Sequence, residues 1–202
     1  MLNNILKPFH YLRIHHGAKK KVDWYLPTFF TFVSLAFFIA LDQTLKVDVF
    51  SASGLINRTL SFIQSLPGFY IAALAAIATF NKIDIDYIMP WPAPKMAIQI
   101  AGKTQDIELT RRRFLCLLFA FLTAESLLII GISIISISAA EPLKTLIPPI
   151  YHQLVKYGFV GFFAFLVWQM IVATFWGLYY LGDRLHHPDM RPAPTNPEIQ
   201  RS

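Results

Sequence analysis

The residue with the clearest capacity for chemistry is Glu125, the one acidic residue within the apolar run Phe114–Ala140. A helix rises 1.5 Å per residue, so Glu125 is expected about 16 Å from Phe114, near the middle of a bilayer core. Gln169, in another apolar run, is expected about 18 Å from Leu181 and therefore at a matching depth. We predict that these side chains form an intramembrane polar pair whose hydrogen bond fixes helix packing. The alternative is that Glu125 carries protons or lines an ion path or pore.

Other reactive residue types do not assemble into a catalytic or metal-binding pattern. A metal site needs several ligands at coordinating distance, and adjacent side chains point apart. We therefore interpret five of the six histidines as solvated, and we expect no metal, no cofactor and no enzyme activity; the five are His10, His15, His16, His186 and His187. A single cysteine, Cys116, excludes a disulfide within one chain. No phosphate-binding glycine loop or Ser/His/Asp constellation is present.

Four apolar runs are long enough to hold these groups inside a membrane, and they predict four transmembrane helices: Trp24–Leu41, Leu60–Phe80, Phe114–Ala140 and Gly158–Leu181. The chain is 202 residues long and 55% apolar, which favours one all-α membrane domain. We assign residues 1–185 to this domain, with a cytoplasmic loop at 81–113. Residues 186–202 are rich in proline and are expected to form an extended or disordered cytoplasmic tail.

The basic residues are distributed unequally between the connections. Of 18 Lys and Arg, five precede Trp24, six lie within residues 81–113, three follow Leu181 and four lie elsewhere. The positive-inside rule then places both termini and the 81–113 loop in the cytoplasm, most simply at a bacterial inner membrane. Because topology accounts for the net charge of +6, direct nucleic-acid binding is not expected.

Two basic clusters border predicted spans, and each is a candidate contact for lipid phosphate or for an acidic partner surface. The clusters are Lys19, Lys20 and Lys21 before the first span, and Arg111, Arg112 and Arg113 before the third. The simpler interpretation is that they fix the cytoplasmic ends of the two helices.

The second run contains a helix-disrupting pair, Pro67 and Gly68. Proline removes a backbone donor and glycine loosens the chain, so a kink is expected there. The preceding segment, Leu55–Leu66, has an amphipathic pattern. The run is therefore either kinked at this pair or joined there to an interfacial helix.

A small β-hairpin is predicted in the cytoplasmic loop between the second and third spans. Apolar residues alternate with polar or small ones on both sides of Gly102, at Met96, Ile98 and Ile100 and again at Ile107. Isolated hairpins are marginally stable in water, so this hairpin is expected to need a partner surface.

Two segments resemble a known class of proteins. They are Leu109–Leu128, with its arginines running into an apolar helix, and Leu66–Tyr70 with the alanine-rich sequence that follows. The chain resembles small multispan membrane proteins of bacterial anti-phage systems, most of all the membrane effector encoded beside some retron reverse transcriptases. That resemblance implies a toxin held silent by a reverse transcriptase with its RNA and DNA product, then released on infection to damage the inner membrane and kill the cell.

Other functions stay open beside this one. The chain also resembles the membrane subunit of Kiwa-type systems, which would imply a non-enzymatic anchor or sensor that recruits a cytoplasmic protein or ribonucleoprotein. A small transporter or channel is a further alternative, although transporters normally have more spans or an internal repeat. Small residues on the third and fourth runs, such as Gly131 and Gly161, favour close helix contacts and a homo-oligomer.

Overall fold

The protein is described by a computed structural model that covers residues 6–14, 17, 19–79, 83–89, 93–100 and 103–182. Among these residues, four helical segments are long and apolar enough to cross a membrane: Lys21–Leu45, Leu55–Thr79, Arg111–Leu146 and Pro149–Gly182. Each overlaps one of the four predicted runs. The prediction of a mainly helical protein with four helices long and apolar enough to cross a membrane is therefore confirmed, and the proline-rich tail at 186–202 lies outside the described residues.

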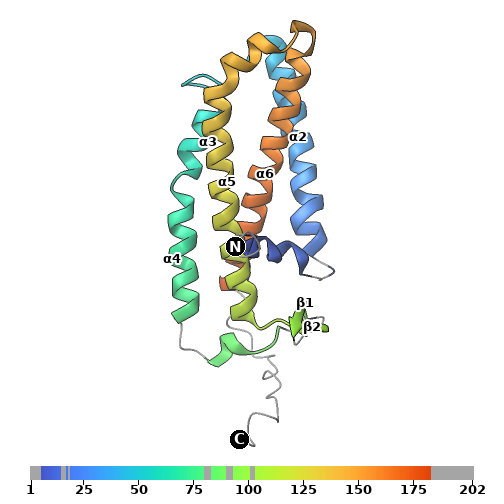
Figure 1. The fold of residues 1–202 in the computed structure, drawn as a ribbon, viewed down its shortest axis with the longest axis vertical. Helices are drawn as coiled ribbons and strands as arrows, with labels where there is room; N and C mark the ends of the chain where they lie inside the picture. The colour runs from blue at the N-terminus through green and yellow to red at the C-terminus, as the bar shows by residue number, and fades with distance from the viewer. Residues whose placement is uncertain are drawn as a thin grey trace, which may run out of the picture.

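The spans stand beside one another in a row (Figure 1). Helix α2 (Leu26–Leu45) packs on α6 (His152–Gly182), and α6 packs on α5 (Arg111–Leu146). On its other side α5 packs on α3 (Leu55–Ile63) and α4 (Leu66–Thr79). The first and last spans are thus neighbours, and α5 supplies more of the buried apolar residues of the core than any other element.

The second span consists of two helices. Helix α3 ends at Ile63 and α4 begins at Leu66, with a turn at Gln64 and Ser65 between them. Pro67 and Gly68 lie in the first turn of α4, where proline is tolerated because its missing N–H is not needed. Both helices pack along α5, so this structure has a segmented span rather than a span joined to a separate interfacial helix.

The loop between α2 and α3 is held in a tight conformation at both ends. Lys46 has a φ of 48° and ends α2, and its N–H donates to the carbonyl of Asp42 at 3.1 Å. At the start of α3, a Cβ added to Gly54 would lie 2.7 Å from the carbonyl oxygen of Val49. Glycine is therefore required at that position, and the loop stays close to the neighbouring helix ends.

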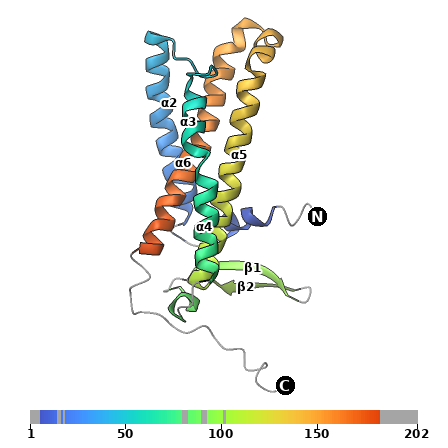
Figure 2. The same cartoon turned by 90° about the vertical axis from the view of Figure 1, so that its left-hand side faces the viewer.

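The predicted hairpin is present between α4 and α5. Strands β1 (Lys95–Ile100) and β2 (Lys103–Glu108) are antiparallel, with a register from Lys95 opposite Glu108 to Ile100 opposite Lys103. The hairpin extends sideways from the lower end of the row (Figure 2). An isolated bridge between Ile88 and Thr110 connects its base to the start of α5, and Gly102 lies outside the described residues.

An N-terminal segment lies across the helices at the lower half of the row (Figure 1). Its first part is the 3₁₀-helix η1 (Lys7–Arg13), which packs on α5, and its second part is the π-helical turn η2 (Lys21–Tyr25), which leads into α2 and packs on α6. Tyr11 of η1 is fully buried and stacks on Phe121 of α5, with ring centroids 5.0 Å apart. The segment is therefore part of the packed interior.

Candidate functional site

A buried polar cluster lies where the N-terminal segment meets α5 and α6, and Asp23 is its centre. The carboxylate of Asp23 forms an ion pair with Lys19 and accepts a hydrogen bond from the Tyr11 hydroxyl at 3.2 Å. Its backbone carbonyl accepts a hydrogen bond from Nε2 of Gln169 at 3.0 Å. Lys19 and Asp23 are 4% and 3% exposed, so this ion pair is enclosed by protein on all sides.

The electrostatics of the cluster favour a protonated Tyr11. Burial, followed by the nearby Asp23 charge, raises the pKa of Tyr11 well above its ordinary value. Burial also lowers the pKa of Lys19, and the Asp23 carboxylate opposes that change. The hydroxyl of Tyr11 therefore remains a hydrogen-bond donor at every physiological pH, which keeps η1 attached to Asp23.

Glu125 faces this cluster from α5. It is 3% exposed, and neither oxygen of its carboxyl group has a hydrogen-bond partner among the described residues. Asp23 and Tyr11 are close enough to interact with it electrostatically. A buried carboxyl group without a hydrogen-bond partner costs about 1–3 kcal/mol, so Glu125 opposes the packed arrangement around it.

The predicted hydrogen bond between Glu125 and Gln169 is wrong. The amide of Gln169 donates to the carbonyl of Asp23, while both Glu125 oxygens are without a partner in the described part of the chain. Asp23 lies near the start of the first span, so the polar cluster lies at the level of that helix start. The expected depth of Glu125 in a membrane stays a prediction.

The arginines before α5 do not form one surface cluster. Arg111 is buried, and Arg112 donates to both carboxylate oxygens of Asp86 at 2.7 and 3.0 Å and to the carbonyl of Ile77 at 2.8 Å. The hydrogen bond from Arg112 holds the pKa of Asp86 below its usual range. Arg111 is thus enclosed by protein, which corrects its expected role as a lipid or partner contact. Arg112 is half-buried and Arg113 is exposed, and for these two that role stays a prediction.

The lysines before the first span also differ in how far they are buried. Lys19 is buried against Asp23, so its expected role as a lipid or partner contact is wrong. Lys20 and Lys21 are exposed, and for them that role stays a prediction. Among the described residues, no group of three or more His, Cys, Asp or Glu side chains could hold a metal ion. The histidine doublets lie outside those residues.

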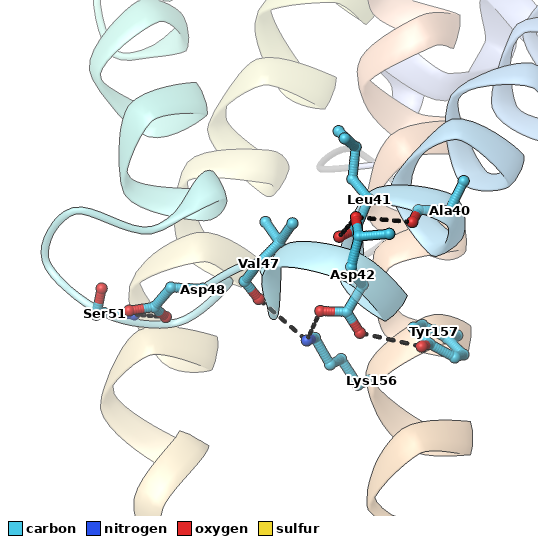
Figure 3. Close-up of polar contacts among 9 residues, drawn as sticks. Ala40, Leu41, Asp42, Val47, Asp48, Ser51, Lys156 and Tyr157 are labelled. Atoms are coloured by element: carbon cyan, nitrogen blue, oxygen red, sulfur yellow. Dashed lines mark hydrogen bonds and ion pairs between the residues drawn. The ribbon is translucent and has the colours of Figure 1, made fainter.

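A second polar cluster joins the end of α2 to the start of α6, and the sequence did not predict it. Nζ of Lys156 donates to Asp42 at 2.6 Å and to the carbonyl of Val47 at 3.0 Å, and the Tyr157 hydroxyl donates to the other Asp42 oxygen at 3.0 Å (Figure 3). Nothing in the spacing indicated that residues more than a hundred positions apart would meet.

Beside this cluster is a cavity of about 670 Å³. It is bounded by the upper part of α5, the first turns of α6 and the loop after α2, and its lining is mainly apolar. Glu141, Lys144 and His152 contribute to its lining. A cavity of this size can hold a small organic molecule or part of a lipid.

Comparison with known protein families, curated proteins and solved structures finds no match for this chain. The functional assignment therefore rests on the geometry above. Asp23 is the residue that sequence reasoning missed at the predicted site, although one signal was present: an acid immediately before an apolar run, four positions after a lysine.

Proposed function

We propose that the protein is an effector of a bacterial anti-phage system that breaches the inner membrane when it is released from inhibition. The observation that carries this proposal is the buried, unpartnered carboxyl group of Glu125 beneath the N-terminal segment. The effector acts without enzyme chemistry, as a homo-oligomer, with both termini and the hairpin in the cytoplasm. A cytoplasmic protein or ribonucleoprotein keeps it silent, as the resemblance to retron effectors implies.

The polar cluster supports a closed and an open arrangement. In the closed arrangement, Tyr11 and Asp23 cover Glu125, and the aromatic contact between Tyr11 and Phe121 fills the space beside α5. When the N-terminal segment leaves, Glu125 and Gln169 become the polar wall of a path for water and ions between α5 and α6. The cost of burying Glu125 favours that change, and the contacts of Asp23 oppose it.

The effector reading is tested by inducible expression in bacteria, with membrane potential read by a dye and permeability read by propidium entry. The wild-type protein is expected to depolarise the cells, and Tyr11→Ala is expected to depolarise them at a lower protein level because it loosens the cover. Tyr179→Ala is the matched control, since Tyr179 is an exposed tyrosine near the C-terminal end of α6. Normal potential with both wild type and Tyr11→Ala, at verified membrane levels, would exclude the effector function.

The proposed topology has its own test. Reporter fusions after Ser202 and within the loop at Gly102 should be active only in the cytoplasm, because any other placement exports a strongly basic segment. Periplasmic activity of either fusion would overturn the placement of the termini and the hairpin.

A membrane anchor or sensor is the second candidate, and the hairpin favours it. Strands β1 and β2 form a sheet of two strands, and within the described residues no further strand joins it. Lys95, Asp106 and Glu108 are exposed on it. Replacing residues 95–108 with a flexible Gly/Ser loop separates the candidates: an anchor loses its cytoplasmic partner, whereas an effector keeps its capacity to depolarise the membrane.

A further inference from the structure

We propose that the cavity beside the Asp42–Lys156 pair binds one zwitterionic phospholipid of the phosphatidylethanolamine type. The cavity of about 670 Å³ is bounded by α5, α6 and the loop after α2. These parts lie at the ends of the helices that are remote from the hairpin (Figure 1). This site is separate from the polar cluster around Asp23. Its occupancy does not depend on whether the protein is an effector or an anchor.

The apolar part of the lining selects an acyl chain. Ile135, Ile137, Val155 and Phe159 contribute side chains from two facing helices, and Ala139 and Ala140 leave room between them. These helices belong to spans, so the surrounding phase is hydrocarbon, and a lipid tail can enter from the side without crossing water. Apolar lining with a few convergent polar groups is the usual composition of a binding pocket.

The charged groups on the α2 side of the cavity already have partners within the protein. Lys156 is neutralised by Asp42 and is also held by the carbonyl of Val47, so its charge is not available to a ligand (Figure 3). Asp48 accepts a hydrogen bond from the backbone N–H of Ser51 at 3.2 Å, and the Ser51 hydrogen bonds hold the pKa of Asp48 below its ordinary value. Asp48 is therefore a fixed negative charge that the loop already uses.

Two opposite charges on α5 remain for a head group. Glu141 and Lys144 both line the cavity and both are exposed, and the structure records no ion pair of either one among the described residues. They lie three positions apart near the end of α5, on the same side of the helix. One cation and one anion side by side complement a head group that carries a phosphate and an ammonium group, with Lys144 facing the phosphate and Glu141 facing the ammonium.

A purely anionic lipid fits this rim less well. Phosphatidylglycerol offers the same phosphate to Lys144 but leaves Glu141 next to a negative head group without a cation. Phosphatidylcholine supplies a quaternary ammonium that cannot donate a hydrogen bond to Glu141. The rim thus predicts the order phosphatidylethanolamine, then phosphatidylcholine, then phosphatidylglycerol.

The experiment is native mass spectrometry of the purified full chain, delipidated and then titrated with each of the three phospholipids in turn. Wild type is expected to bind one phosphatidylethanolamine in preference to the other two. Ala140→Trp fills the cavity and should abolish that bound lipid, whereas Leu128→Trp, at an exposed position of the same helix outside the cavity, should leave it. Circular dichroism of both variants checks that the helices remain folded.

Variants of Lys144 and Glu141 test the two charges at the cavity rim separately. Lys144→Gln should lower affinity for both phosphatidylethanolamine and phosphatidylglycerol, by about two- to five-fold, as exposed ion pairs do. Glu141→Gln should lower affinity for phosphatidylethanolamine alone and so reduce the preference for it. Equal binding of the three lipids by the wild type would overturn the head-group assignment, and unchanged binding by folded Ala140→Trp would overturn the cavity as the site.

Discussion

Neutralising Asp23 should release the N-terminal segment from the spans. The substitution Asp23→Asn keeps the shape of the side chain and an oxygen that can accept from Tyr11, so it removes the charge while leaving that hydrogen bond in place. Lys19 then becomes a buried ammonium without its counter-ion, and removing one partner of a buried pair costs about 3–5 kcal/mol. The variant also removes the repulsion between Asp23 and Glu125. That gain is smaller, because the ion pair is in direct contact whereas no hydrogen bond joins the two acids.

The expected size of the effect follows from this difference. A loss of about 3–5 kcal/mol raises the equilibrium population of the released segment by a factor of about 100 to 4,000, as an upper bound. Trypsin cleavage after Arg13 in inverted membrane vesicles follows that population when opening and closing are fast. Cleavage should therefore accelerate by a large factor in Asp23→Asn, and membrane depolarisation should occur at lower expression.

A double variant isolates the ion pair from other effects. In Lys19→Met with Asp23→Asn, the unpaired ammonium is gone, and replacing a buried pair by neutral groups is often close to neutral in stability. Cleavage and depolarisation should return toward the wild-type values. If the double variant is as open as Asp23→Asn, or if Asp23→Asn is cleaved no faster than wild type, the ion pair does not hold the segment and the reasoning is refuted.

Three further predictions concern other parts of the molecule. Glu125→Leu should raise the unfolding temperature and weaken depolarisation, because an unsatisfied buried group costs about 1–3 kcal/mol or more; lower stability in a melting experiment would show that the carboxyl has a partner after all. Lys156→Met should destabilise the protein by about 3 kcal/mol by leaving Asp42 unpaired, and Asp42→Asn in the same chain should recover most of the loss in thermal melts. Arg112 lowers the pKa of Asp86, so the stabilisation from this pair is complete above pH about 4 and is lost as the pH falls through the lowered pKa. Asp86→Asn should therefore reduce the acid dependence of the melting temperature. A melting temperature that depends on pH in the same way as in the wild type would contradict the assignment.

The elements of this fold could be predicted from sequence because local patterns determine them. Apolar length gave the four spans, and alternation on both sides of Gly102 gave the hairpin. The partners inside the membrane could not be predicted, because they depend on which spans become neighbours. Glu125 and Gln169 were paired by their expected depth alone. In the structure, the amide of Gln169 donates instead to the carbonyl of Asp23, in the segment that leads into the first span.

Charge is the second reason for the errors at the site. A lysine or arginine next to an apolar run is counted as a cytoplasmic residue, and that count is correct on average. Lys19 and Arg111 are nevertheless buried. The segment that contains Lys19 folds against α5 and α6, and the first turn of α5, which contains Arg111, is bonded to the chain before the hairpin through the Arg111 N–H and the carbonyl of Tyr87. Burial of one basic residue in a cluster is a property of the tertiary fold and leaves no signal in composition.

The pairing of α2 with α6 determines when the protein can be completed during synthesis. The first span to leave the ribosome contains Asp42 and Ser34, whose partners Lys156 and Trp168 belong to the last span. Until that last span is inserted, α2 must remain in the lipid with a carboxyl group lacking its cation, and the N-terminal segment lacks the amide of Gln169. A chain interrupted before α6 therefore cannot form these contacts, and the packing of α2 is completed only after the last span has been synthesised.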